Sequence, residues 1–507
     1  MPHFIAKLPA KITMPDSGST LDFKLESGAF KLPSIRSPHI ALIAMPYTYQ
    51  SSARFCFLHE ITRECDVLLK CVKSLRPTPI GIAKDALSRL SAHYEVLQDN
   101  LSLSSSKQQV SSAFLLGERE ILDLVAREAS ALDFGQSVEP KARFDSTILE
   151  IGFGSGRHIL HLARQNPNAL VLGLEIHTPS IEQVLRQIEI LGLENLYLSC
   201  LDARVFLSCA PSHSLREIYI HFPVPWNKAK HRRVLNGKLL QEALRVLDLA
   251  GMLEFRTDDR EYFNDVLEEA NALESTAPKS FCVRHSINES QAITSKYEAR
   301  WLRQSKDIYT IIVRPDSRGN ASGDSSKGFE QDSSADVIVD SPTTLESSAQ
   351  NFAFSFDEKL VKSLLAKVLE AESSADGFVR LSRIADWLCA QKFVLDSGDL
   401  DFGKLDFGLS VTKDSGTESA LEAKAGLKPE SSARGFLRIV DMYASSTARR
   451  FALLVSFGDF AYPCSRLVLF AESGQGCYLP EPPIPTQLNY KAHALFVRIL
   501  TQVLERL

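Results

Sequence analysis

Residues 147–157 read TILEIGFGSGR and decide the fold. The first five form a short apolar run of strand type that contains a single acid, Glu150. Glycines then stand at 152, 154 and 156, and a helical pattern begins at Arg157. Glycine permits a tight turn and lets the backbone approach a ligand closely, and the helix that follows points its N-terminus at the same spot. The stretch therefore predicts a buried strand that turns through glycines into a helix.

Outward from this stretch, strand-like and helical patterns alternate. Strands are expected at 147–151, 169–174, 195–200, 217–222, 252–256 and 308–313, and helices at 157–165, 179–191, 235–249 and 260–270. Strands that alternate with helices indicate an α/β fold, a mostly parallel sheet with helices on both faces. Ligands of such sheets bind outside the carboxyl ends of the strands, so functional residues are sought directly after each strand.

Acids accompany the first three strands. Glu150 stands two residues before the glycines, Glu175 ends the second strand and Asp202 follows the third. Glu175 is placed to accept hydrogen bonds from ribose hydroxyls, and Asp202 from an adenine amino group. A dinucleotide fingerprint needs G-x-G-x-x-G, but position 157 is Arg. The spacing suits S-adenosylmethionine (SAM) instead, with Glu150 near its cationic methionine end. We expect the cofactor on Glu150, Gly152, Gly154, Glu175 and Asp202.

The fourth strand leads into residues 222–233, FPVPWNKAKHRR, which we call the basic loop. Two prolines stiffen it, and four Lys/Arg residues within 228–233 form a phosphate-binding footprint in an otherwise acidic segment. The alternative is a solvated helix start. Trp226 is suited to stacking on a base, and a place in the core is an equal alternative for it.

Asp258 follows the fifth strand, where its carboxylate is placed to accept N1–H and N2–H of a guanine. Capping of the next helix by Asp258 or Thr257 is an equal alternative. A polar cluster at 295–300 precedes the last strand. His158 and His161 share one helix and, with no carboxylate partner evident, are expected at the surface. No metal site is predicted.

Taken together, these motifs resemble the bacterial tRNA (guanine-N7-)-methyltransferases over residues 115–314, about two-fifths of the chain. The matching segments are the acid and glycines at 150–156, the ribose acid Glu175 with Ile176-His177, the adenine acid Asp202, the counterpart at 222–233 of the family's F-P-D-P-W-x-K segment and basic run, Thr257-Asp258, and the counterpart at 295–298 of its T-x-[FY]-E segment. Ser295 replaces the family's Thr in the last of these and keeps the hydroxyl. The N-terminal MPHFIAK and the long terminal extensions resemble a long-form branch of that family.

The resemblance implies a class I SAM-dependent methyltransferase that transfers the methyl of SAM to N7 of a guanine in the tRNA variable loop. It implies that Lys228, Asp258, Ser295 and Glu298 bind the guanine or nearby RNA. Lys230, Arg232 and Arg233 are expected to bind phosphates. The family's Asp between the prolines is Val224 here, so no catalytic residue is assigned.

The division of the chain is expected to be an N-terminal extension (1–110) that contacts RNA, the methyltransferase domain (114–315), a Ser-rich flexible linker (316–350) and a C-terminal α+β domain (351–507) of unassigned role. Residues 1–110 carry 13 Lys/Arg against 9 Asp/Glu, although the whole chain has a net charge of −5. A polyanion such as tRNA must therefore bind a local patch. The N-terminal extension is expected to mix short strands with a helical stretch around 65–98.

Composition excludes several protein classes. Hydrophobic residues are 44% and charged residues 23% of the 507, which is typical of globular proteins and not of a disordered chain, a collagen or a coiled-coil rod. No apolar run reaches membrane-spanning length. The nine cysteines form no CxxC pair, which fits a reducing cytoplasm. A monomer is favoured.

Two alternative functions remain. One is a catalytically silent protein that binds SAM and tRNA and lost turnover when Val224 replaced the acid. The other is a class I methyltransferase that acts on a different substrate. The three intact acids, Glu150, Glu175 and Asp202, favour an active enzyme.

Overall fold

The computed structural model describes most of residues 1–101, 112–315 and 354–506. It leaves out 9–27, 50–51, 102–111, 134–142, 277–280, 290–303, 305, 316–353, 396–434 and short stretches elsewhere after residue 355. Three sheets organise the described part of the chain. A seven-stranded sheet forms the central domain, and a six-stranded antiparallel sheet precedes it and another follows it in sequence. The expected linker at 316–350 lies outside the described residues.

The central sheet has the order β12-β13-β11-β10-β7-β8-β9. Its strands are β7 (Ser146–Ile151), β8 (Ala169–Leu174), β9 (Leu196–Ser199), β10 (Leu215–His221), β11 (Leu247–Thr257), β12 (Phe281–Ile287) and β13 (Tyr309–Pro315). β7 to β11 pair in parallel, whereas β13 runs antiparallel to both its neighbours. This mostly parallel sheet confirms the predicted fold class.

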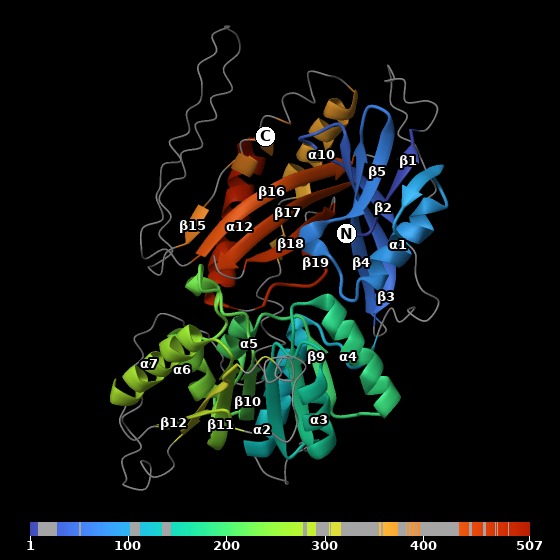
Figure 1. The fold of residues 1–507 in the computed structure, drawn as a ribbon. Helices are drawn as coiled ribbons and strands as arrows, with labels where there is room; N and C mark the ends of the chain where they lie inside the picture. The colour runs from blue at the N-terminus through green and yellow to red at the C-terminus, as the bar shows by residue number, and fades with distance from the viewer. Residues whose placement is uncertain are drawn as a thin grey trace.

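Helices cover both faces of the central sheet (Figure 1). They are α2 (Glu118–Asp133), α3 (Arg157–Gln165), α4 (Thr178–Leu191), α5 (Ala203–Cys209), α6 (Gly237–Val246) and α7 (Arg260–Thr276). α3 and α4 pack with Ile148 and Val171, while α2, α5, α6 and α7 belong to the core that contains Leu149 and Leu172. Successive strand side chains point to opposite faces, so the two cores lie on opposite sides of the sheet.

The N-terminal sheet has the order β2-β3-β4-β5-β1-β6, and the C-terminal sheet β14-β19-β18-β17-β16-β15. The first comprises β1 (His3–Lys7), β2 (Phe30–Pro33), β3 (Ile40–Tyr49), β4 (Ser52–Thr62), β5 (Asp66–Cys71) and β6 (Val96–Asp99), with η1 (Lys73–Leu75) and α1 (Gly81–Ser91). The second comprises β14 (Phe354–Ser355), β15 (Phe393–Leu395), β16 (Gly435–Ser445), β17 (Arg450–Asp459), β18 (Cys464–Ala471) and β19 (Gln475–Leu479), with α10 (Glu358–Ser373) and α12 (Gln487–Arg506).

These two terminal sheets form one body. Ser34 bridges to Tyr443, the Ile35 N–H donates to Met442 O at 2.9 Å, and His59 Nε2 lies 2.9 Å from the Tyr443 hydroxyl. Side chains from both sheets share one buried cluster that includes Leu32 and Leu454. Figure 1 shows the blue N-terminal strands beside the orange and red C-terminal ones. The ends of the chain are therefore joined through a common core.

This terminal body contacts the central domain near the carboxyl ends of β8 and β9. Arg466 pairs with Glu118 at 2.5 Å and Arg54 with Glu120 at 3.1 Å, both at the start of α2. The Ile80 N–H donates to Glu182 Oε1 at 3.0 Å on the first half of α4. The extensions thus reach the edge at which the cofactor site was predicted.

Some elements differ from expectation. The helical stretch predicted around 65–98 is a helix only over Gly81–Ser91, because β5 and β6 occupy its two ends. The predicted helix 235–249 ends at Val246, and β11 begins at Leu247. Strand β12 was missed because its alternation of half-buried and exposed residues lacks a long apolar run. No helix in the described part of the chain is long and apolar enough to span a membrane.

Candidate functional site

The glycine turn between β7 and α3 adopts backbone conformations that favour glycine. Gly152, Gly154 and Gly156 have φ of 74°, 50° and 79°. A side chain at Gly152 would meet nothing within 4 Å, so the backbone there borders open space. At Gly156 an added Cβ would lie 2.2 Å from Val184 Cγ2 on α4. Gly152 thus leaves room beside the turn, while Gly156 allows α3 and α4 to pack.

We expect Gly156→Ala to lower the free energy of unfolding more than Gly152→Ala. Both changes impose a left-handed backbone on alanine, at about 1–2 kcal/mol. Gly156→Ala adds a clash with the stiff, buried Val184, worth about another 1–3 kcal/mol. Urea unfolding of the ligand-free proteins measures the difference, and equal losses would show that the contact with Val184 relaxes freely.

Glu175 links the glycine turn to the segment that connects β8 to α4. Its Oε2 accepts the Gly154 N–H at 3.0 Å, and its Oε1 accepts the His177 N–H at 2.9 Å. These bonds hold the carboxylate at the carboxyl end of β8, directly before α4. A carboxylate has about four acceptor positions, so it has lone pairs left for two ribose hydroxyls. The donor and acceptor chemistry therefore fits the ribose of SAM.

Asp202 is held at the start of α5. Its Oδ1 accepts the Arg204 N–H at 2.9 Å, which caps the helix, and the Arg204 guanidinium pairs with Oδ2 at 2.7 Å. The carboxylate remains about a quarter exposed, at 28%. It stands after β9, the strand next to β8, and so lies on the same edge as Glu175. An adenine amino group would use its remaining acceptor capacity.

Glu150 lies beneath the turn, with 3% of its surface exposed. Its Oε2 is 3.0 Å from His158 Nδ1 in the first turn of α3. The expectation that His158 is a surface residue with no carboxylate partner is therefore wrong. The strand–turn–helix path folds α3 back over the end of β7, which brings residues eight positions apart into contact. His161, one turn further along α3, is half-buried.

The basic loop carries backbone strain at two bulky residues. Phe222 has φ of 51° and Trp226 has φ of 44°, a left-handed region that large side chains rarely adopt. Such strain persists only where surrounding contacts impose it, and it gathers at functional sites. Val224 lies between these residues and is 60% exposed. The loop thus presents an apolar side chain at the position where the resembling family has an acid.

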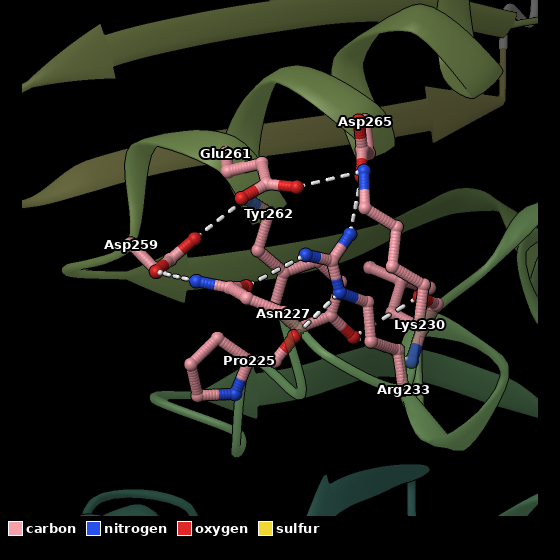
Figure 2. A network of polar contacts seen from close by, with 9 residues as sticks. Pro225, Asn227, Lys230, Arg233, Asp259, Glu261, Tyr262 and Asp265 are labelled. Carbon is pink, nitrogen blue, oxygen red and sulfur yellow. Dashed lines mark hydrogen bonds and ion pairs between the residues drawn. The ribbon is translucent and has the colours of Figure 1, made fainter.

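A polar network holds this conformation (Figure 2). Arg233 Nε donates to Pro225 O at 2.6 Å, and its Nη2 donates to Asn227 Oδ1 at 2.9 Å. Arg233 also pairs with Asp265 of α7 and lies over the Tyr262 ring, 4.4 Å from its centre. Arg233 is only 3% exposed. The prediction that Arg233 binds phosphate is therefore wrong. Its guanidinium is bonded to groups within the protein and anchors the loop.

The other cations of the loop are at the surface. Lys228 is exposed, and Arg232 is exposed with its guanidinium 4.7 Å from the centre of the Trp226 ring. Lys230 pairs with Glu261 at 2.9 Å and with Asp265 at 2.7 Å. These carboxylates raise the pKa of Lys230, and the bond from Lys230 lowers that of Asp265. Trp226 is 40% exposed, which excludes a place in the core.

Asp258 stands at the carboxyl end of β11 without capping a helix. Asp259 is the cap of α7, because its Oδ1 accepts the Tyr262 N–H at 2.8 Å. Thr257 Oγ1 accepts the Asp259 N–H instead. Asp258 Oδ2 pairs with Lys306 at 3.0 Å, and its side chain keeps 19% of its surface exposed. The capping alternative for Asp258 is thereby excluded, which leaves its carboxylate at the site edge.

Two predicted substrate residues, Ser295 and Glu298, lie outside the described residues. Within the part of the chain that is described, no group of three His, Cys, Asp or Glu side chains is arranged to hold a metal. Sequence reasoning missed Asp265 and Lys306, which pair with predicted site residues from 32 and 48 positions away. No local pattern could have indicated those partners.

Comparisons with known proteins identify relatives of this chain. Residues 145–311 match a family described as "Putative methyltransferase". A protein of Helicobacter hepaticus is 32% identical over 498 residues, 93% of this chain and all of the relative. One of Helicobacter pylori strain J99 is 31% identical over 99% of this chain and 97% of its own. Both bear the name tRNA (guanine-N(7)-)-methyltransferase. A solved "antibiotic related Methyltransferase" is 20% identical, covers 34% of this chain and 89% of its own, and has a TM-score of 0.28.

Proposed function

The chain belongs to the bacterial tRNA (guanine-N(7)-)-methyltransferases, and from this premise we propose how the carboxyl edge of its central sheet divides the work. The protein is a SAM-dependent enzyme that methylates N7 of guanine in tRNA. In our proposal the β7–β9 half of the edge binds SAM, and the β10–β11 half binds a guanine of the variable loop. The 32% identity to a Helicobacter relative over 93% of this chain, together with three acids on one sheet edge, carries this proposal.

On the cofactor half, the open space at Gly152 takes the methionine part of SAM. Glu175 accepts the ribose hydroxyls, while its bonds to the Gly154 and His177 N–H groups keep it oriented. Asp202 accepts the adenine amino group, and Glu150 provides negative charge beneath the methionine end. SAM supplies a methyl group on a positively charged sulfur.

On the substrate half, no general base is required. Guanine N7 carries a lone pair and no proton, so the new N–C bond uses that pair and the breaking C–S bond leaves its electrons on sulfur. What the chain must supply is alignment. Asp258 holds the base by accepting hydrogen bonds from N1–H and N2–H. Val224 contacts the base and has no catalytic role. The purine becomes positively charged, which a site lined with carboxylates stabilises.

The tRNA backbone is bound by Lys228 and Arg232, which are exposed, with Lys230 in a supporting place beside Glu261 and Asp265. When a cation that contacts phosphate is replaced by a neutral side chain, tRNA binding by the variant releases one fewer counterion. Each of Lys228→Gln and Arg232→Gln is expected to reduce the slope of log K against log salt by about 0.7–0.9. Filter binding of tRNA from low to moderate salt measures the slope.

A matched control for this titration is Arg164→Gln. Arg164 is exposed in the last turn of α3, at the opposite end of the helix from the glycine turn. Its slope should stay at the wild-type value. Unchanged slopes for Lys228→Gln and Arg232→Gln would reduce the cluster to a solvated surface.

The N-terminal extension is proposed to widen the tRNA footprint. Lys73 and Arg76 are exposed just before the Thr78–Ile80 segment, and Ile80 donates to Glu182 of the central domain. Deleting residues 1–110 would strip core partners from the C-terminal sheet, so point changes are the better test. The double change Lys73→Gln/Arg76→Gln should weaken tRNA binding and leave SAM binding unaltered. Unaltered tRNA binding would remove the extension from the footprint.

Two alternatives are separated by assays of product. A silent tRNA-binding protein would bind SAM and tRNA without turnover, and a methyltransferase with another substrate would leave tRNA unlabelled. Replacing the variable-loop guanine of a transcript by adenosine should abolish methylation if that guanine is the acceptor. All nine cysteines are free thiols, which supports our placement of the enzyme in the reducing cytoplasm. We favour a monomer, and sedimentation would test it.

A further inference from the structure

Five ionisable side chains form a polar cluster on one face of the central sheet, directly under the glycine turn. In register, Glu150 of β7 pairs with Tyr219 of β10, which in turn pairs with Glu254 of β11. His221 of β10 pairs with Arg256 in the same ladder. Residues two apart on a strand share a face, so these side chains point to the same side, where His158 of α3 meets them. We call them the histidine cluster: Glu150, His158, His221, Glu254 and Arg256.

The cluster has two hydrogen-bonded acid–histidine pairs in contact with one another. His158 Nδ1 lies 3.0 Å from Glu150 Oε2, and His221 Nε2 lies 2.9 Å from Glu254 Oε1. The two imidazole rings are 4.5 Å apart between centres. Glu150 and the second pair are nearly inaccessible, whereas the His158 side chain retains 16% of its surface. The cluster is therefore almost entirely buried, and it adjoins the proposed cofactor site.

Of the two imidazoles in this cluster, His158 takes up a proton more readily than His221. Burial disfavours its charged form, but the Glu150 and Glu254 carboxylates outweigh burial and raise the pKa of His158. Burial, helped by His158 itself, lowers the pKa of His221. Two adjacent imidazolium rings would repel each other, so protonation of His158 disfavours protonation of His221.

We propose that His158 is a positioning residue for the cofactor, which fixes the Glu150 carboxylate beneath the methionine end of SAM and sets how much of its charge the cofactor meets. This inference rests on the proposed cofactor site. When His158 is protonated, its positive charge offsets that of Glu150 toward the cationic cofactor. When His158 is neutral, the full carboxylate charge acts on SAM.

Other charges around His158 do not reverse this sign. The groups that face it are Glu150 from β7, Tyr219 and His221 from β10, Glu254 and Arg256 from β11, and His161 from its own helix. Of the two rings in the described cluster, His158 is the one whose pKa is raised, so it is the ring whose charge the test follows.

Two opposite pH dependences follow. The pKa of His158 is raised in the folded state, so the pair stabilises the ligand-free enzyme at pH below the unfolded pKa, and that stability is lost as pH rises through the folded pKa. Affinity for SAM should rise over the same interval, because the competing positive charge disappears. Two like charges a few ångströms apart at a partly hydrated site account for about a 5- to 10-fold change.

The experiment measures the Kd of SAM by calorimetry from pH 6 to 8 for wild type, His158→Gln and the matched control His161→Gln. Titration of the SAM amino group is the same in all three and cancels. After this shared dependence is divided out, wild type and His161→Gln should gain about 5- to 10-fold in affinity, and His158→Gln should be flat. If His158→Gln folds poorly, Glu150→Gln should give the same flat profile.

Contrary results are distinct. An equal rise in His158→Gln and wild type, or a flat wild-type profile with measurable SAM binding, overturns the role of His158 while leaving the cofactor site intact. Absence of SAM binding at every pH overturns the proposed cofactor site and this inference with it. A purely structural histidine would show falling thermal stability with pH without any accompanying rise in SAM affinity.

Discussion

Replacing Arg233 by methionine should lower the free energy of unfolding by about 2–4 kcal/mol. Breaking a buried ion pair by removing one partner costs about 3–5 kcal/mol; here Asp265 is a third exposed and keeps Lys230, so the lower part of that range applies. Methionine keeps the apolar stem against Tyr262 and removes the bonds to Pro225 and Asn227. The expected drop in Tm is about 5–10 °C, which scanning calorimetry measures.

Arg232→Met is the matched control, because the two arginines are adjacent and chemically identical. Arg232 is exposed and lies over Trp226, so its loss should change Tm by less than about 2 °C, as is usual for surface changes. At low salt the order should be reversed for tRNA affinity. Arg232→Met should weaken tRNA binding more than Arg233→Met, because it removes a direct phosphate contact. Equal Tm losses in both variants would contradict the division of the basic loop into an anchor and a phosphate contact.

Asp258→Ala should lower kcat/KM for tRNA by about 100-fold. Hydrogen bonds to a charged group are worth about 1.5–3 kcal/mol each. The lower limit applies because Asp258 is 19% exposed and also pairs with Lys306, and about 3 kcal/mol for the two bonds corresponds to a loss of roughly 100-fold. Asp258 is no helix cap, so the loss should fall on substrate recognition and not on folding. Steady-state methylation with a tRNA transcript measures it.

Val224→Ala is the comparison for Asp258→Ala. Val224 is 60% exposed, and removing two methyl groups there should change kcat/KM by less than about threefold. Asp258→Asn should lie between the two, because an amide keeps one acceptor. Equal losses at Asp258 and Val224 would show that the strained loop, and not the β11 acid, positions the guanine.

The central domain was predictable because its strands are buried on both faces. Such strands appear in sequence as continuous apolar runs, and β8 (Ala169–Leu174) is buried at every residue. The glycine turn and the acids after each strand followed from the same local pattern. The alternating strand β12 carries a weaker signal, and it was missed for that reason.

Contacts between distant parts of the chain were beyond local patterns. Arg232 and Arg233 look alike in sequence, and contacts with Asp265 and Tyr262 on α7 distinguish the buried one from the exposed one. The common core of the terminal sheets joins residues about 400 positions apart, such as Ser34 and Tyr443. His158 is different: a helix that follows a glycine turn lies over its own strand, so its contact with Glu150 could have been inferred from the spacing.

The most direct test of the account is nucleoside analysis after incubating the full-length enzyme with methyl-labelled SAM and unmodified tRNA transcripts. The account predicts that the label appears as 7-methylguanosine, that Glu175→Ala abolishes it by loss of SAM binding, and that Arg164→Gln leaves it unchanged. SAM binding without transfer, or label in any other nucleoside, would contradict the assignment of the site to guanine N7.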